Sequence, residues 1–150
     1  MTTRNVLLWL HICAIAGWLG ANFVQLVLSP YFEKMGGETR RGWTEATGWL
    51  GTRYYAVIGL LILLTGVGLV LKTPYDFSAG FVALGIFTVV LGAVMGGAVF
   101  APLTKKRLEG IDSGDESRAK AALNRITMAG VFDTALVAVT VLAMVYRWKA

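Results

Sequence analysis

The sequence predicts an all-α membrane protein in which four transmembrane helices form one bundle, a single domain covering residues 1–150. Hydrophobic residues make up 56% of the chain and charged residues only 15%, whereas a soluble domain of this size needs about 25% charged residues. Four apolar runs also approach or exceed the roughly 20 residues that a helix needs to cross a hydrocarbon core. Finally, Lys and Arg gather between alternate runs, as the loops of a multi-pass membrane protein do.

The four runs set the expected spans, which are residues 6–28, 54–71, 77–103 and 126–146. The first run is too long for the hydrophobic region of a signal peptide, and no small-residue cleavage site with a soluble domain follows it, so we expect a retained span. The second run is short and can begin upstream, at Trp49. The third is long enough to cross the bilayer at a tilt.

Polar stretches separate the runs. "EKMGGETRRG" follows the first, "KTPYD" makes a tight turn between the second and third, and "KKRLEGIDSGDESRAK" precedes the last. Within that last stretch, "SGDE" fits a capping box, in which Ser113 and Glu116 would each satisfy a backbone amide. The fourth helix should therefore begin near Asp115, before it enters lipid.

The basic residues predict the orientation in the membrane. Ten Lys and Arg residues lie in the connections after the first and third spans, and four lie on the other side. The positive-inside rule places loops 29–53 and 104–125 in the cytoplasm and both termini on the non-cytoplasmic side of an inner membrane. The lipid bilayer is then the expected partner. No nucleic-acid partner is expected, because seven acidic residues interrupt the two basic loops.

Small residues predict where the helices pack, because in lipid they allow two backbones to approach closely. Gly92 and Gly96 lie four residues apart in the third span, with Gly85 two turns before Gly92, and Gly17 and Ala21 have the same spacing in the first span. Packing among the four helices of one chain is the interpretation we favour. The alternatives are a homo-oligomer across the glycine face and a place in a larger membrane complex.

The polar residues of the first span fall on one helical stripe. Positions separated alternately by four and three residues stay on one side of a helix. In this span they are His11, Ile15, Trp18, Asn22, Gln25 and Ser29. The other faces are largely apolar, as lipid requires. We therefore expect the stripe to point into the bundle.

Asp133 is the only carboxylate within a predicted span. An ionisable group at that depth is costly unless it faces the bundle interior or water, so it is a candidate functional residue. The first span runs inward and the fourth outward, which brings Asn22 and Gln25 to about the depth of Asp133. Buried polar groups need partners. We therefore predict a hydrogen-bonded cluster of Asn22, Gln25 and Asp133, joined by Thr134 or a water molecule.

His11 is the only histidine of the chain and lies in the opposite half of the first span. Four roles remain open for it: a structural histidine bonded to a carbonyl or hydroxyl, an axial ligand of haem b, a ligand in a copper or other metal site, and a member of a proton relay. A second haem ligand would have to come from another subunit or from Met144. That methionine lies eleven residues after Asp133, on the same inward face and near His11 in depth.

The segment "LHICAIAGWLGANFVQLVLSPYF" resembles the first helix of the copper-resistance D (CopD) superfamily. The resemblance rests on His11, Trp18, Gly20 and Pro30. The stretch "FAPLTKKRLEG", where the third span ends, fits the same pattern. The segment is also similar to a large group of uncharacterised four-helix bacterial membrane proteins and, more distantly, to the HemJ-type protoporphyrinogen oxidases. The resemblance implies a four-helix bundle whose first-helix histidine holds haem or a metal. This chain lacks the further histidines of copper-handling relatives and the later-span lysine of the HemJ-like enzymes.

Three classes of function are compatible with the sequence. The first, which we favour, is a small non-catalytic bundle, alone or as a subunit of a larger membrane complex. The second is a redox protein that binds haem or a metal through His11. The third is a proton-coupled transporter that uses Asp133 with Asn22 and Gln25.

Overall fold

A computed structural model describes residues 2–147 of the chain. Within these residues all regular secondary structure is helical, and four continuous helices are long and apolar enough to cross a membrane. Two of the four contain a π-helical turn, labelled η1 and η2. In chain order the elements are α1 (Thr3–Met35), α2 (Gly37–Trp49), η1 (Leu50–Tyr54), α3 (Tyr55–Val70), α4 (Gly80–Met95), η2 (Gly96–Phe100), α5 (Ala101–Ser113) and α6 (Glu116–Val145).

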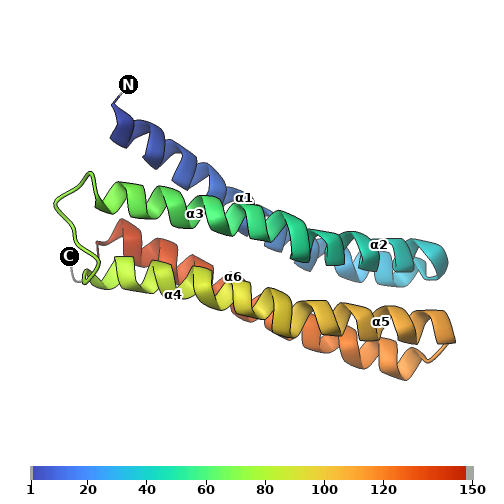
Figure 1. Cartoon of the computed structure of the whole chain (residues 1–150). Coiled ribbons are helices and arrows are strands. Elements are labelled where there is room, and N and C mark those ends of the chain that lie inside the picture. The colour runs from blue at the N-terminus through green and yellow to red at the C-terminus, as the bar shows by residue number, and fades with distance from the viewer. Residues whose placement is uncertain (1, 148–150) are drawn as a thin grey trace.

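The helices form two hairpins that lie side by side along their lengths (Figure 1). The first hairpin pairs α1 with α2, η1 and α3, and the second pairs α4, η2 and α5 with α6. The start of α1, the end of α6 and the 71–79 loop lie at one end of the bundle. The two short turns within the hairpins lie at the other end (Figure 1).

The helices extend well beyond the expected spans, so the predicted loops 29–53 and 104–125 are wrong as loops. Most of their residues are helical, and the chain reverses only at Gly36 and around Gly114, with φ angles of 64° and 74°. Glycine adopts such left-handed conformations at little cost. The apolar runs did not indicate where the helices end, because polar residues continue the helices and pair across them. Arg41 of α2, for example, donates to Asp112 of α5 at 2.7 Å.

The predicted capping box at the start of the fourth helix is also wrong. Ser113 belongs to α5, where its hydroxyl donates to the Glu109 carbonyl at 2.8 Å. The residue that caps α6 is Asp115, whose side chain accepts a bond from the Arg118 amide at 3.0 Å. The predicted start near Asp115 agrees with this helix. The error arose because the left-handed Gly114 separates Ser113 from α6.

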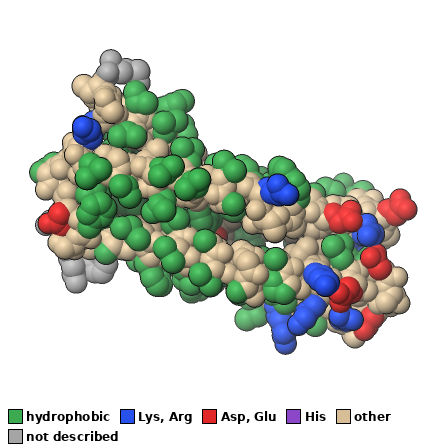
Figure 2. Space-filling model, viewed as in Figure 1, with side chains coloured by type: hydrophobic (Ala, Val, Ile, Leu, Met, Phe, Trp, Pro, Cys, Tyr) green, Lys and Arg blue, Asp and Glu red, His purple; other side chains and the backbone are tan. Residues whose placement is uncertain are grey.

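The outer faces of the helices are apolar and the charges gather at one end. Large hydrophobic side chains such as Val27, Leu64 and Val139 are more than half exposed. Figure 2 shows hydrophobic groups over most of the length of the bundle and charged groups concentrated at the end with the hairpin turns. Lipid would cover such a surface. Inside the bundle, Trp18 and Ile62 belong to the main hydrophobic cluster.

Each of the four predicted packing glycines faces another part of the same chain. A Cβ atom at Gly92 would lie 2.7 Å from the Trp18 ring, one at Gly85 would lie 2.7 Å from Met144 Cε, and one at Gly17 would lie 2.8 Å from the Tyr54 hydroxyl. A Cβ atom at Gly96 would lie 3.7 Å from the Gly51 carbonyl oxygen. These contacts are the close approaches that small residues permit.

Candidate functional site

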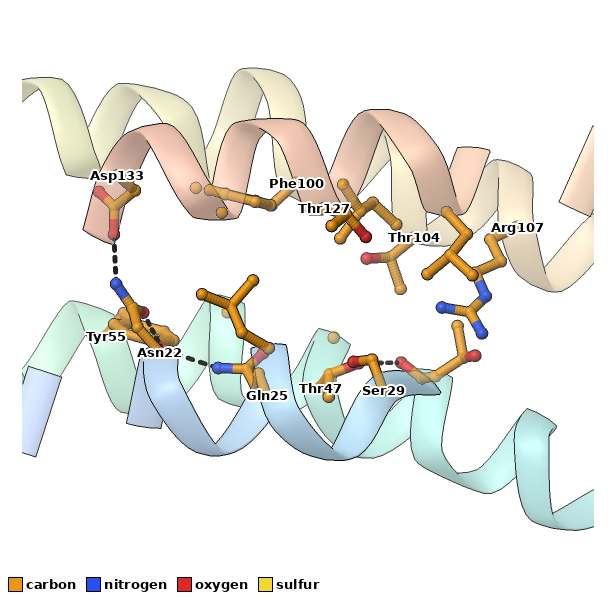
Figure 3. Close-up of a pocket in the computed structure, with 18 of the residues that line it drawn as sticks. Asn22, Gln25, Ser29, Thr47, Tyr55, Phe100, Thr104, Arg107, Thr127 and Asp133 are labelled. Atoms are coloured by element: carbon orange, nitrogen blue, oxygen red, sulfur yellow. Dashed lines mark hydrogen bonds between the residues drawn. The ribbon is translucent and has the colours of Figure 1, made fainter. Parts of the chain in front are cut away.

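Asp133 lies inside the bundle, only 5% exposed, and ties α6 to α1. Its Oδ2 atom accepts one hydrogen bond from Trp18 Nε1 at 2.9 Å and another from Asn22 Nδ2 at 2.8 Å. The two donors lie four residues apart on α1, and therefore on one face of that helix. Figure 3 shows the bond from Asn22 to Asp133 across the space between the two hairpins.

Tyr55 extends this cluster to α3. Its hydroxyl donates to Asn22 Oδ1 at 2.5 Å and accepts from Gln25 Nε2 at 2.7 Å. The structure thus brings Asn22 and Asp133 into direct contact and connects Gln25 to them through Tyr55. Thr134 lies outside the cluster, because its hydroxyl donates to the Gly130 carbonyl of its own helix at 2.7 Å.

Trp18 and Tyr55 are members of the cluster that the sequence did not assign to it. Trp18 lies on the polar stripe of α1, and an indole N–H buried inside a bundle needs an acceptor. The sequence therefore contained a reason to include Trp18 in the cluster. Tyr55 had no comparable signal. It follows the π-helical turn η1, which changes the rotation of α3 relative to α2.

A cavity of about 440 Å³ lies between the two hairpins and begins at this cluster. Oδ2 of Asp133 accepts both of the hydrogen bonds described above, whereas Oδ1 has no hydrogen-bond partner among the described residues. Asp133 belongs to the cavity wall. A free carboxyl oxygen is therefore available to whatever occupies the cavity.

The walls of the cavity come from both hairpins. Polar hydroxyl groups line it along its length, and Figure 3 labels four of their residues, Ser29, Thr47, Thr104 and Thr127. Apolar side chains, including Leu26, Phe100, Leu123 and Ile126, complete the wall between its ends. A concave, largely apolar site of this volume with a few polar groups is typical of pockets for small molecules.

Both π-helical turns border the cavity. Gly51 of η1 and Gly96 of η2 lie in its wall and approach each other across the hairpin interface. Single π-helical turns inside α-helices occur frequently at functional sites. Their location on both sides of the same cavity supports its identification as the candidate site.

The end of the cavity away from Asp133 carries charges. Arg107 of α5 has a side chain that is only 4% exposed, and its Nη2 atom donates to Glu33 Oε2 of α1 at 2.5 Å. Oε1 of Glu33 also lies 3.5 Å from Nη1 of Arg40 on α2. Nη2 of Arg40 in turn lies 2.7 Å from Oε1 of Glu116 on α6. In the sequence these residues are recognisable only as loop charges, because their partners lie on different helices. Together the four residues connect both hairpins at this end.

His11 lies apart from this cavity, at the interface of α1 and α3. Its Nδ1 atom lies 2.8 Å from the Thr65 hydroxyl, which donates to the Leu61 carbonyl at 2.6 Å. The same hydroxyl lies 3.2 Å from the Ile62 carbonyl, so Thr65 connects His11 to the backbone of α3. The imidazole is 8% exposed and packs against Gly66. This is the geometry of a histidine that links two helices.

The residues present do not fit a haem held between His11 and Met144. Met144 packs against Gly85 and lines a second cavity, with Thr88 and Thr140, whose volume is only about 30 Å³. That volume suits about one water molecule, and His11 lines neither this cavity nor the larger one. Within residues 2–147 there is also no group of three or more His, Cys, Asp or Glu residues that could hold a metal ion.

No protein-family model, curated protein or solved structure matches this chain. Its function must therefore be inferred from the chemistry of the cavity and of its two polar ends.

Proposed function

We propose that this protein is a non-catalytic membrane protein that binds a small amphipathic molecule in the cavity between its two hairpins. The observation that carries the proposal is the cavity of about 440 Å³, which has the Asp133 cluster at one end and Arg107 with Glu33 at the other. Apolar side chains and hydroxyl groups line it between the two ends. An elongated molecule with polar and apolar parts matches that distribution.

Two features support binding over a purely structural role for the polar groups. Buried polar groups are normally paired, because leaving one without a partner costs free energy. Asp133 Oδ1 accepts no bond within the described chain, although it lies in the cavity wall. The cavity also adjoins two π-helical turns. A ligand or ordered water that donates to Asp133 would complete the cluster.

The proposed orientation follows from the charges. Most of the Lys and Arg residues lie in the helical segments that flank the hairpin turns, so the positive-inside rule places this end of the bundle in the cytoplasm. The Arg107 end of the cavity then faces the cytoplasmic surface, and both chain termini lie on the other side. On α1 the cavity wall extends from Trp18 to Lys34, about 24 Å at 1.5 Å per residue.

Proton-coupled transport through Asp133 is a second candidate function, and the free Oδ1 atom in the cavity wall favours it. A transporter of this kind needs a carboxyl group that exchanges protons with water in the cavity. Asp133→Asn keeps the shape of the side chain but not its acidity. If this variant leaves every transport and growth phenotype unchanged, proton coupling at Asp133 is ruled out.

Haem binding through His11 remains a prediction of the sequence alone, and the packing of Met144 against Gly85 does not favour it. The visible absorption spectrum of purified protein tests it directly. A Soret band that disappears in His11→Ala would support haem at this residue. The lack of a Soret band after haem supplementation would eliminate it.

Photolabelling tests the proposed function. The probes are three compounds with the same sixteen-carbon chain and a mid-chain diazirine, one with a carboxylate, one with a hydroxyl and one with an ammonium head group. Each is irradiated with the protein in phosphatidylcholine vesicles, and the labelled residues are identified by peptide mass spectrometry. We expect at least one probe to label cavity residues such as Leu26 and Phe100.

Gly130→Leu is the variant that should block this labelling. Gly130 lines the cavity, and a Cβ atom there would make an ordinary contact of 3.9 Å with Leu26, so a larger side chain would occupy the cavity. Gly20→Leu is the matched control, because Gly20 is an exposed helical glycine with no neighbour within 4 Å. Labelling confined to outward residues such as Val27, or cavity labelling that persists in Gly130→Leu, would contradict the proposal.

A further inference from the structure

We infer that the molecule in this cavity is a single-chain amphiphile with a carboxylate head group, which binds Arg107 while its apolar chain runs along the cavity wall and ordered water donates to Oδ1 of Asp133. This inference rests on the proposed function and names the chemical class of its ligand. Three observations carry it: the incomplete hydrogen bonding of Arg107, the charge balance around it, and the shape and composition of the cavity.

Arg107 is a buried cation with most of its donors unused. A guanidinium group carries five N–H donors, yet the one hydrogen bond of the Arg107 side chain within residues 2–147 runs from Nη2 to Glu33. The side chain is 4% exposed and contributes to the cavity wall. Figure 3 shows it at the end of the cavity opposite Asp133. A carboxylate at this end would accept the unused N–H groups, in the two-pronged geometry that arginine favours.

The charges at this end of the cavity leave room for one more anion. Three cations lie there: Arg107 and Lys34 in the wall, and Arg40 beside them. Two carboxylates pair with these cations. Glu33 pairs with both Arg107 and Arg40, and Glu116 pairs with Arg40 alone. The sum of three positive and two negative charges is one positive charge, which is that of Lys34 at the solvent-exposed edge of the wall. One ligand carboxylate would neutralise it, whereas an ammonium group would add to it.

The remainder of the cavity suits one apolar chain. Between its two ends the wall contains Leu26, Phe100, Leu123 and Ile126 together with threonine hydroxyl groups, and no further charged side chain. Figure 2 shows the surface hollowed along the seam between the two hairpins, so a lipid-dissolved molecule has a lateral route to this wall. The volume of about 440 Å³ lies in the lower part of the range for small-molecule sites.

Arg107→Gln tests this inference with the same three probes. In the wild-type protein we expect the carboxylate probe to label Leu26 and Phe100 on the order of tenfold more than the ammonium probe, as hydrogen bonds to a charged group imply. In Arg107→Gln the carboxylate probe should lose about that factor, while the hydroxyl probe labels as before. Arg118→Gln is the control, because Arg118 pairs with Glu109 on the half-exposed surface.

Two further variants keep the test valid if Arg107→Gln folds poorly. Arg107→Lys retains the charge without the two-pronged geometry and should keep part of the carboxylate labelling. Glu33→Gln removes the carboxylate that accepts the hydrogen bond from Nη2 of Arg107, so labelling by the carboxylate probe should increase. Equal labelling of the cavity by all three probes, blocked by Gly130→Leu, would overturn this inference and leave the proposed function standing. If none of the probes labels the cavity, the proposed function itself fails.

Discussion

The indole nitrogen of Trp18 lies 2.9 Å from Oδ2 of Asp133, and the ring of the same tryptophan lies 2.7 Å from the position that a Cβ atom of Gly92 would take. One side chain of α1 therefore contacts α6 through a hydrogen bond and α4 through close packing. Both hairpins meet at this residue. Substitutions around Trp18 consequently separate the contribution of polar bonding from that of shape.

Trp18→Phe should destabilise the protein by about 1 kcal/mol, because it removes the N–H donor and leaves Asp133 with Asn22 alone. The free energy of unfolding can be measured by titration with a denaturing detergent and monitored by circular dichroism. Trp49→Phe is the control, since Trp49 is 61% exposed and should change the stability little. A double-mutant cycle with Asp133→Leu separates the hydrogen bond from the smaller ring, and a coupling energy of zero would contradict this prediction.

Gly92→Ala should cost about 1–3 kcal/mol, since the added methyl group would overlap the Trp18 ring in a tightly packed interface. Gly97→Ala provides the comparison. Gly97 has no neighbour within 4 Å of its Cβ position, so alanine there should be neutral or stabilise the helix by up to about 1 kcal/mol. The same unfolding titration measures both variants. Equal stability of the two would show that α1 and α4 do not pack closely at this glycine.

Glu33→Gln should destabilise the protein without ligand by about 1–3 kcal/mol, because Arg107 is buried and has Glu33 as its partner. This loss of stability is smaller than for a fully buried ion pair. The Glu33 side chain is 29% exposed, so water can partly replace its carboxylate as a partner of Arg107. Glu45→Gln is the matched control: Glu45 pairs with Arg41 on the surface, where such pairs contribute about 0–1 kcal/mol.

The double variant Glu33→Gln with Arg107→Gln checks the origin of that loss. If the loss reflects a buried charge without its partner, removing the charge as well should recover part of the stability. Additive losses in the two single variants would instead indicate that Glu33 and Arg107 act independently.

The four helices and the pairing of Asn22 with Asp133 could be predicted from the sequence for one physical reason. Lipid admits few polar residues, and the periodicity of α1 places them on one side. With a single carboxyl group at that depth, few pairings were available, and Asn22 donates to Asp133 as expected. The same reasoning fails for Thr134, whose hydroxyl is satisfied within its own helix.

Other features depend on geometry that periodicity does not contain. Tyr55 faces the cluster because the π-helical turn η1 rotates α3 relative to α2. Arg107 and Glu33 meet because α5 and α1 continue side by side beyond the apolar runs. The start of α6 was ambiguous for a different reason, since Ser113 and Asp115 are both good capping residues. The choice between them depends on the backbone at Gly114.

Asp115 should make the stability of α6 depend on pH. The hydrogen bond from the Arg118 amide, and then that from the Ser117 hydroxyl, lower the pKa of the Asp115 carboxyl below its usual value. A group whose pKa is lower in the folded state contributes stability above its unfolded pKa, about 4 for Asp. That contribution is lost as the pH falls through the lowered folded value. The carboxylate also interacts favourably with the helix dipole.

Asp115→Asn keeps a capping oxygen but carries no charge, so it isolates the titration. Thermal unfolding of α6 should begin at a lower temperature in this variant than in the wild type at neutral pH, and the difference should shrink as the pH is lowered below about 4. Circular dichroism of the two detergent-solubilised proteins measures the thermal unfolding of the wild type and of the variant. A difference that stays constant from neutral to acid pH would mean that the charge on Asp115 does not stabilise the start of α6.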